Sequence, residues 1–241
     1  MRLAIFSALR WECRPVLKAM SNVSRQSIGG WPAWKAKSDA GEVCLVQTGV
    51  GPKRAGDAAA AVAASDRFDL FLSAGCAGAL APDLRPGDLI VASSAVADGR
   101  RFEVDSAFES DARKVCVRRA LRWHRGAVLT SPIVLTKAAV KREAAAASGA
   151  IAVEMEGSAV AGVAAQHTIP FGQVRAILDT ADLELHESGD FMDPESGRLR
   201  PLDVLRFVAA HPSAASQLLA LRRMMAAAET TLQTFFASYL R

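Results

Sequence analysis

Short apolar runs alternate with longer alanine-rich or amphipathic segments along most of the chain. Runs that are apolar on both faces predict strands buried within a sheet, and the segments between them predict helices. The predicted strands cover residues 2–9, 43–50, 69–73, 89–92, 127–135, 151–154 and 173–178. The predicted helices cover residues 52–65, 109–122, 137–147 and 157–166, and two more follow from about residue 201 with a break at His211-Pro212.

This alternation of strands and helices predicts an α/β fold. We expect residues 1–241 to form one domain, in which helices flank a mixed central β-sheet and the region from about residue 201 is helical. In sheets of this kind, ligands bind beyond the carboxyl ends of the strands. The side chains at the predicted strand ends are therefore the first candidates for chemistry.

Composition narrows the class of protein further. Hydrophobic residues make up 51% of the chain and charged residues 22%, which excludes disorder as its general state. No apolar run is long enough to span a bilayer, and the first residues lack the apolar core of a signal peptide. We therefore predict a cytoplasmic protein without a membrane span, and peripheral contact with a membrane surface stays open.

The net charge of +4 raises the question of nucleic-acid binding. The basic residues, however, occur in spread doublets such as Lys141-Arg142 and Arg222-Arg223, which favours a solvated surface over a binding groove. The four cysteines and four histidines are dispersed without metal-ligand spacing. We predict no nucleic-acid partner, no metal and no organic cofactor.

Two acidic side chains follow the predicted strand at 151–154. The apolar run ends in Glu154-Met155-Glu156, directly before a predicted helix. Acids favour helix N-termini, so Glu154 could either cap the following helix or take part in function, and both alternatives stay open. For Glu156 we favour function, because a carboxylate at a strand end can accept hydrogen bonds from the two hydroxyls of a ribose.

A third acid, Asp179, follows the predicted strand at 173–178. The alternative to function is a helix cap or a turn. This alternative is weaker for Asp179 than for Asp182, the next acid along the chain. Cleavage of a glycosidic bond needs a proton on the leaving group while the sugar gains oxocarbenium character. A carboxyl group of raised pKa can supply that proton.

Small residues mark two other strand ends, at Thr48-Gly49-Val50-Gly51 and at residues 74–78, which we expect to be a loop. Together with Glu12 and the two acidic blocks, these segments resemble the superfamily of nucleoside phosphorylases and nucleosidases. That superfamily includes methylthioadenosine/S-adenosylhomocysteine nucleosidase and purine nucleoside phosphorylase. The resemblance covers the chain from Met1 to about Asp182, and it rests on the order of these blocks.

The resemblance implies a role for each block. Asp179 would protonate the purine N7, Glu156 would bind the ribose hydroxyls, and Glu12 would position the attacking water. The other implied binding residues are Met155 under the sugar, Val153 and Ile133 in the base pocket, and Gly75 and Cys76 on the side of attack. Glu154 is a further candidate for substrate binding.

The attacking group stays open at this point. Glu12 favours water. The resemblance implies that Arg10 and Gly49 lie on the side where phosphate or water would bind, so phosphate is a possible co-substrate, and a surface role is the open alternative for Arg10. The phosphorylases carry a Gly-Asp-Pro segment with an arginine after the first strand, and this chain lacks that segment. It also has Leu178 before Asp179, where many relatives have serine.

The C-terminal region resembles the hopanoid-associated members of the superfamily, which are linked to the removal of adenine from adenosylhopane. This likeness rests on residues 193–200, residues 202–210 and a long helix after Pro212 with Leu218, Leu221, Met225, Ala228, Leu232 and Phe235. A core or subunit-interface helix is the alternative, and we favour it for most of these residues.

The resemblance therefore predicts an enzyme that releases adenine from a 5′-substituted adenosine, with adenosylhopane as the favoured substrate. The alternatives are a methylthioadenosine/S-adenosylhomocysteine nucleosidase and a general purine nucleoside phosphorylase. An inactive nucleoside-binding protein is disfavoured, because Glu12, Glu156 and Asp179 are all present. The expected partner is a purine nucleoside, which can carry a bulky apolar 5′ group, and the expected assembly is a homodimer.

Overall fold

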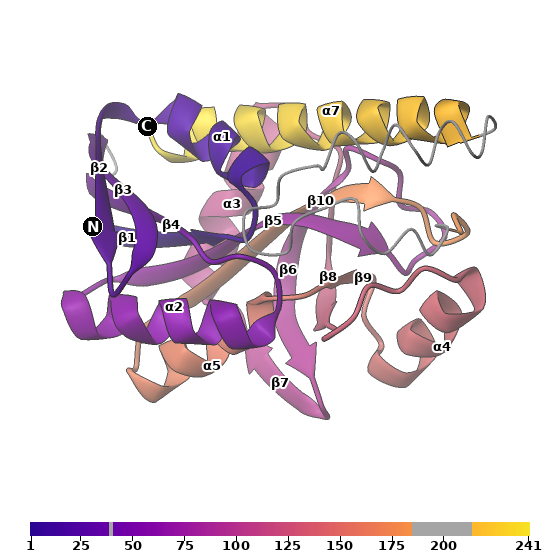
Figure 1. Ribbon diagram of the computed structural model, residues 1–241, viewed down its shortest axis with the longest axis horizontal. Coiled ribbons are helices and arrows are strands. Elements are labelled where there is room, and N and C mark those ends of the chain that lie inside the picture. The colour runs from indigo at the N-terminus through magenta and orange to yellow at the C-terminus, as the bar shows by residue number, and fades with distance from the viewer. Residues whose placement is uncertain (39–40, 185–213) are drawn as a thin grey trace.

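A single mixed β-sheet forms the centre of the computed structural model, which describes residues 1–38, 41–184 and 214–241 (Figure 1). Its strands are β1 (Arg2–Ser7), β2 (Ser21–Ile28), β3 (Trp31–Ser38), β4 (Gly41–Gln47), β5 (Leu70–Ala79), β6 (Leu89–Ala97), β7 (Arg100–Glu103), β8 (Trp123–Thr130), β9 (Ala152–Glu154) and β10 (Phe171–Asp179). The helices of the described ranges are α1 (Arg10–Ala19), α2 (Pro52–Ser65), α3 (Ser106–Arg118), α4 (Ala138–Ser148), α5 (Gly157–Gln166) and α7 (Ala214–Tyr239).

Five of the strands pair with one another in a closed ring. β5 pairs with β10 and with β9, β10 pairs with β6, and β8 joins β6 to β9. The remaining strands extend from β5 in the order β1, β4, β3 and β2, apart from β7, which pairs with β6. This closure places Gly78 of β5 between Val153 of β9 and Asp179 of β10. The closed part of the sheet therefore brings together three of the segments on which chemistry was predicted, at residues 74–78, 154–156 and 179.

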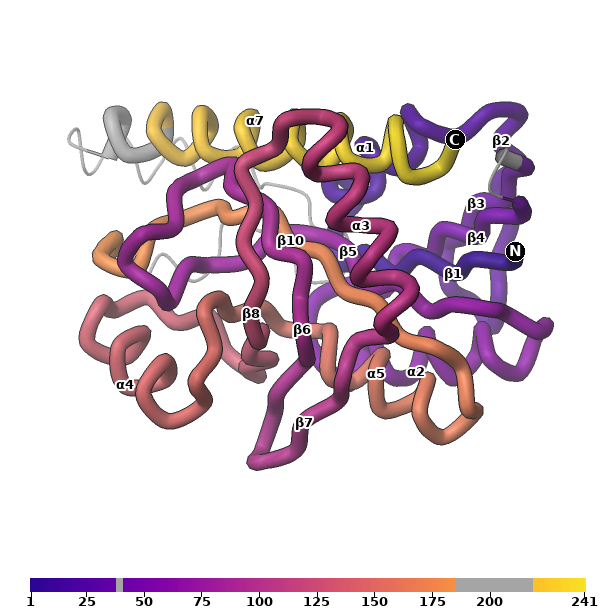
Figure 2. Tube along the Cα trace, turned by 180° about the vertical axis from the view of Figure 1, so that it is seen from behind, coloured from indigo at the N-terminus to yellow at the C-terminus, as the bar shows by residue number. Residues whose placement is uncertain are grey.

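Helices cover the sheet on two sides, as Figure 1 shows: α1 and α7 lie together along one side, and α2 and α5 lie along the opposite side. Seen from behind in Figure 2, α3 crosses the sheet near β6 and β10. The predicted α/β fold with a mixed sheet flanked by helices is thus confirmed.

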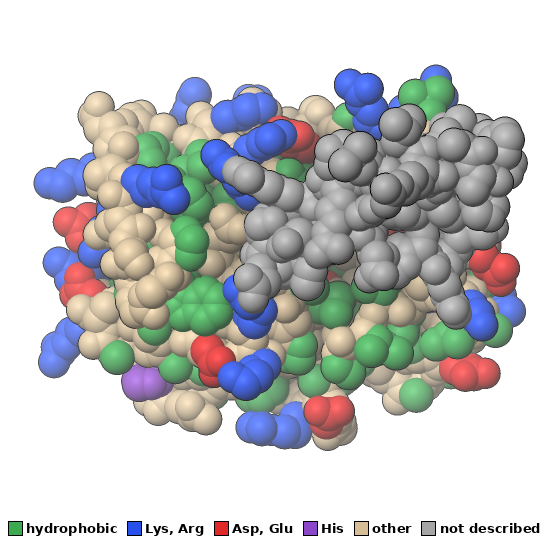
Figure 3. Space-filling view, viewed as in Figure 1, with side chains coloured by type: hydrophobic (Ala, Val, Ile, Leu, Met, Phe, Trp, Pro, Cys, Tyr) green, Lys and Arg blue, Asp and Glu red, His purple; other side chains and the backbone are tan. Residues whose placement is uncertain are grey.

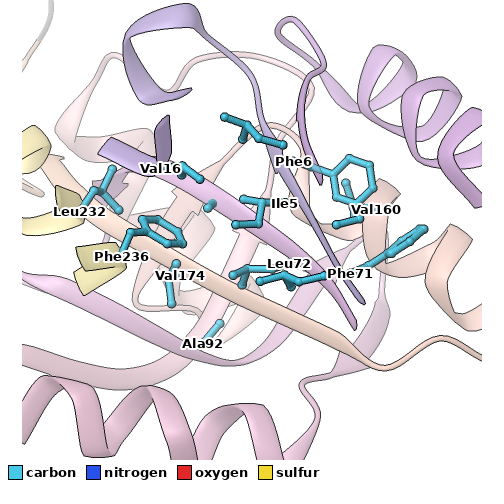
Figure 4. Packing of buried hydrophobic residues seen from close by; sticks show 14 of the residues in the cluster. Ile5, Phe6, Val16, Phe71, Leu72, Ala92, Val160, Val174, Leu232 and Phe236 are labelled. Atoms are coloured by element: carbon cyan, nitrogen blue, oxygen red, sulfur yellow. The ribbon is translucent and has the colours of Figure 1, made fainter. Parts of the chain in front are cut away.

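Helix α7 is part of the hydrophobic core. Ala228, Leu232 and Phe235 are fully buried, and Figure 4 shows Leu232 and Phe236 near Val174 of β10. These residues therefore take the core role that was favoured over a substrate channel. Residues 193–200, residues 202–210 and the predicted break at His211-Pro212 lie outside the described residues, as does the side chain of Leu218.

The structure differs from the prediction in two places near the site. The first strand ends at Ser7, and residues 10–19 form helix α1, whose first turn is stabilised by the Glu12 side chain accepting a hydrogen bond from the Leu9 amide. The predicted loop at 74–78 is the second half of β5. It is extended because β9 and β10 pair with it on both sides, a non-local effect that the small residues do not reveal.

Strands β2 and β3 were not predicted. They form a hairpin whose turn has Gly29 and Gly30 at φ +56° and +88°, the left-handed geometry that two-residue hairpin turns require. Most side chains of β2 are exposed, so this strand lacks the apolar run by which the other strands were recognised. None of the described helices is long and apolar enough to cross a membrane.

Candidate active site

Glu154 is held in place by the protein on both of its carboxylate oxygens. The Thr130 hydroxyl donates to Oε1 at 2.5 Å, and the buried Arg175 guanidinium pairs with Oε2. The backbone amides of Glu156 and Gly157 donate to the same carboxylate at 2.8–3.0 Å, so Glu154 also caps helix α5. Of the two roles left open for this residue, these contacts support the structural one.

Glu156 lies two residues further on, at the N-terminal boundary of α5. Its Oε1 accepts a hydrogen bond of 2.8 Å from the amide of Gly51, in the small-residue segment before α2. Burial, with the nearby negative charge of Glu154 as the next cause, raises the pKa of Glu156 to about 8. The side chain therefore joins two of the predicted strand ends and binds a proton readily near neutral pH.

Asp179 is buried at the end of β10, beside Gly78 of β5. A Cβ atom on Gly78 would lie 3.1 Å from Asp179 Oδ1, so glycine permits this close approach. The Asp179 Oδ2 atom pairs with the ammonium group of Lys141 from α4. Burial raises the pKa of Asp179, and the charge and hydrogen bond of Lys141 oppose that rise.

The carboxyl group of Glu12 lies against Gly75 and Cys76 of β5. The Cys76 amide donates to Glu12 Oε1 at 2.7 Å, and a Cβ on Gly75 would lie only 2.6 Å from that oxygen. Burial raises the pKa of Glu12, although the hydrogen bonds from Cys76 and Leu9 lower it. Burial likewise raises the pKa of the Cys76 thiol well above its usual value, which keeps the thiol neutral.

Arg10 and Gly49 occupy different surroundings. Arg10 is exposed at the start of α1 and lines a surface pocket of about 250 Å³ with Arg25, Pro32, Trp34 and Gln47. Gly49 has a positive φ of +74° and donates its amide to the Ala8 carbonyl at 3.0 Å. The Gly49 amide is thus engaged within the protein.

The residues predicted around the sugar and base differ in exposure. Val153 is buried in β9, and Met155 is half-buried between the two acids. Ile133 is 65% exposed in the segment between β8 and α4. Stacking of a base on Ile133 would therefore need a ligand or another part of the protein to cover it.

Two cations of the site were missed in the sequence. Arg175 is 2% exposed, and its positive charge faces Glu154, Glu156 and Glu12. A charged residue inside an apolar strand was the available signal, because such a residue needs a buried partner. Lys141 was assigned to a solvated doublet, and this was wrong: it is 1% exposed, whereas its neighbour Arg142 is exposed.

The assembled site holds three acids of raised pKa, Glu12, Glu156 and Asp179, on the ends of different elements around β5. Such a set can donate a proton at one place and accept one at another. In the described ranges, no three histidine, cysteine or acidic side chains lie together as metal ligands. Figure 3 shows lysine and arginine side chains spread over one face in small groups.

Comparison with known proteins adds the family context. Residues 2–208 match the model of the phosphorylase superfamily. The fold is similar to that of 5′-methylthioadenosine/S-adenosylhomocysteine nucleosidase from Neisseria meningitidis, with 19% identity, a TM-score of 0.78, and 99% of this chain and 97% of that chain covered. Futalosine hydrolase of Helicobacter pylori is also similar, with 18% identity, a TM-score of 0.73, and coverage of 98% and 97%.

Proposed function

The chain belongs to the phosphorylase superfamily, and from this premise we propose that it hydrolyses the N-glycosidic bond of a purine nucleoside. In the proposed reaction, Asp179 donates a proton to the purine as the bond to the sugar breaks. Glu156 accepts hydrogen bonds from the ribose hydroxyls, and Glu12 orients the water and takes its proton. The raised pKa values of Asp179 and Glu12 suit a general acid and a general base.

One observation favours water over phosphate as the attacking group. The amide of Cys76, on the side of attack implied by the family resemblance, already donates to the carboxyl group of Glu12. An incoming phosphate would lose this donor and would meet a carboxylate at close range, which is unfavourable. A water molecule has no such conflict, and a buried carboxylate can accept its proton.

The substrate we propose is a 5′-substituted adenosine, so the released base is adenine. The similar Neisseria meningitidis structure is a complex with methylthio-immucillin-A, and a Helicobacter pylori nucleosidase structure contains butyl-thio-DADMe-immucillin-A. Adenosylhopane is our favoured substrate, on the basis of the C-terminal resemblance. The buried state of Leu232 and Phe235 does not add to this preference, because these side chains serve the core.

The test is a substrate panel. Adenine release is measured with methylthioadenosine, S-adenosylhomocysteine, adenosine and adenosylhopane, each with and without phosphate, and the sugar product is identified by mass spectrometry. We expect release without phosphate, a free sugar product and the highest kcat/KM for adenosylhopane. A higher kcat/KM for methylthioadenosine would overturn the hopanoid preference, and a sugar 1-phosphate product would overturn hydrolysis.

The assembly is a separate part of the proposal. We propose a homodimer, and sedimentation equilibrium of the purified protein tests it directly. A monomer mass of 25.5 kDa would contradict the dimer without affecting the proposed chemistry.

A further inference from the structure

Among the described residues, Lys141 and Arg175 are the most deeply buried cations, and Lys141 lies outside the Arg175–Glu154 pair. It belongs to α4, which is otherwise rich in alanine, and only 1% of its surface is exposed. An ammonium group removed from water is costly unless all its donors are satisfied. Lys141 meets this condition, because its Nζ atom donates to Asp179 Oδ2, to the Thr180 carbonyl at 2.8 Å and to the Leu183 carbonyl at 3.2 Å.

All three acceptors lie on one short segment at the end of β10. One ammonium group therefore ties the carboxyl group of Asp179 and the turn that follows it to α4. On the other side, Gly78 brings the β5 backbone close to Asp179 Oδ1. The Asp179 carboxyl group is thus held between a cation on Oδ2 and the backbone at Oδ1.

We infer that Lys141 is a positioning residue for Asp179, which fixes the orientation of the carboxyl group and stabilises its ionised form after proton transfer. This inference rests on the proposed function. As the glycosidic bond breaks, its electron pair moves to the purine, and the proton of Asp179 passes to the base. Water forms the new bond to the sugar carbon and gives its proton to Glu12, and Lys141 keeps its own protons throughout.

Among the described residues, few other charges act on Asp179. The Cys76 thiol of β5 lies close enough to Asp179 for the two groups to interact electrostatically, but the thiol is neutral because burial raises its pKa. Asp182 follows in the next turn, is fully exposed, and has its own pKa lowered first by a hydrogen bond from Thr180. Lys141 is therefore the charge that opposes the effect of burial on Asp179. A neutral residue at position 141 should leave a weaker acid that holds its proton to higher pH.

The experiment compares the wild type with Lys141→Met and with Arg142→Met as the matched control. Arg142 is the exposed neighbour on the same helix, so its loss removes a cation without touching Asp179. For adenine release by Lys141→Met, we expect the alkaline limb of kcat/KM to move up by about one pH unit and kcat to fall about tenfold. Arg142→Met should follow the wild-type profile.

A purely structural lysine would give a different result. If Lys141 acts through Asp179, the Lys141→Met change should have little further effect on kcat in an Asp179→Asn background. An unmoved alkaline limb, with kcat falling only in proportion to a lower Tm, would overturn the inference. An equal loss of kcat in the wild-type and Asp179→Asn backgrounds would also overturn it.

A second readout does not depend on turnover. The pKa of Asp179 is measured by NMR of protein labelled with ¹³C at the aspartate carboxyl, with Asp179→Asn used to assign the signal. A higher pKa in Lys141→Met supports the inference, and an unchanged pKa overturns it. If the pKa rises but the wild-type protein releases no adenine from any nucleoside, the coupling to Lys141 stands and the proposed function fails.

Discussion

Two buried ion pairs lie near the ends of β9 and β10, the two strands that flank the end of β5, and they are built differently. In the pair of Arg175 and Glu154, both carboxylate oxygens also accept hydrogen bonds from backbone amides or from Thr130. In the pair of Lys141 and Asp179, the cation binds Oδ2, and Oδ1 faces the Gly78 backbone. The Glu154 carboxylate is surrounded by fixed donors and serves the fold, whereas the Asp179 carboxyl group has the Lys141 ammonium as its charged partner.

Acids that look alike in the sequence can therefore acquire different roles. Glu154 and Asp179 both follow an apolar strand, and both are buried beside a cation. The number of fixed donors around each carboxylate separates them. A saturated carboxylate has no capacity left for a substrate, and a carboxyl group of raised pKa can exchange a proton.

Replacing Asp179 gives the largest expected effect. Asp179→Asn removes the proposed general acid with almost no change in volume, so we expect kcat/KM for adenine release to fall about 10²- to 10⁴-fold. Asp182→Asn, at the exposed acid three residues later, is the control and should keep nearly full activity. Equal activity of Asp179→Asn and wild type would show that Asp179 is not the general acid.

Replacing Arg175 tests whether the Arg175–Glu154 pair stabilises the fold. Arg175→Met leaves Glu154 as a buried charge without its cation, and such losses cost about 3–5 kcal/mol of unfolding free energy. Urea denaturation measures this loss, with Lys114→Met as a control, because Lys114 forms an exposed pair with Asp111. A double variant with Glu154→Gln should recover part of the stability. A loss below about 1 kcal/mol for Arg175→Met would show that the pair is not the scaffold we describe.

Replacing Glu12 tests the water-activating role. Glu12→Gln removes the proposed base, so we expect kcat/KM to fall about 10²-fold. Burial raises the pKa of Glu12, so the wild-type rate should fall on the acid side at a higher pH than an ordinary glutamate would give. A pH–rate series on both proteins checks this, because Glu12→Gln should lack that acid limb. An acid limb retained unchanged in the variant would assign it to another group.

Replacing Glu156 gives a smaller effect, on stability. The folded protein holds the Glu156 proton up to about pH 8, whereas the unfolded chain releases it near the ordinary value of 4.5. The folded state therefore loses stability as pH rises from about 4.5 to about 8. Glu156→Gln cannot ionise, so it should match the wild type near pH 4.5 and be about 1–3 kcal/mol more stable at pH 8. A stability difference that does not change with pH would contradict the raised pKa.

Much of the site was predictable from the residues that follow the apolar runs of the buried strands. Apolar runs that stop at an acid identified Glu154, Glu156 and Asp179, and the mixed sheet brought their surroundings together. The roles of these residues stay predictions until the variants are measured. The segment at 74–78 was misjudged because its extended form depends on β9 and β10, which are distant in sequence.

Lys141 could not have been found in the same way. It stands beside Arg142 in an alanine-rich helix, where a doublet of basic residues indicates a solvated face. Its burial arises because α4 packs its first turns against the segment after β10, and that packing is set by tertiary structure. Arg175 was detectable, since a cation within an apolar strand requires a partner.

A crystal structure of the protein with adenine or a nucleoside analogue would show whether Glu12, Glu156 and Asp179 surround the bound nucleoside. We expect Asp179 to lie within hydrogen-bonding distance of the purine N7 and Glu156 to contact the ribose hydroxyls. We also expect a water molecule between Glu12 and the sugar carbon. A nucleoside bound away from these three acids, or a purine N7 that faces a group other than Asp179, would contradict this expectation.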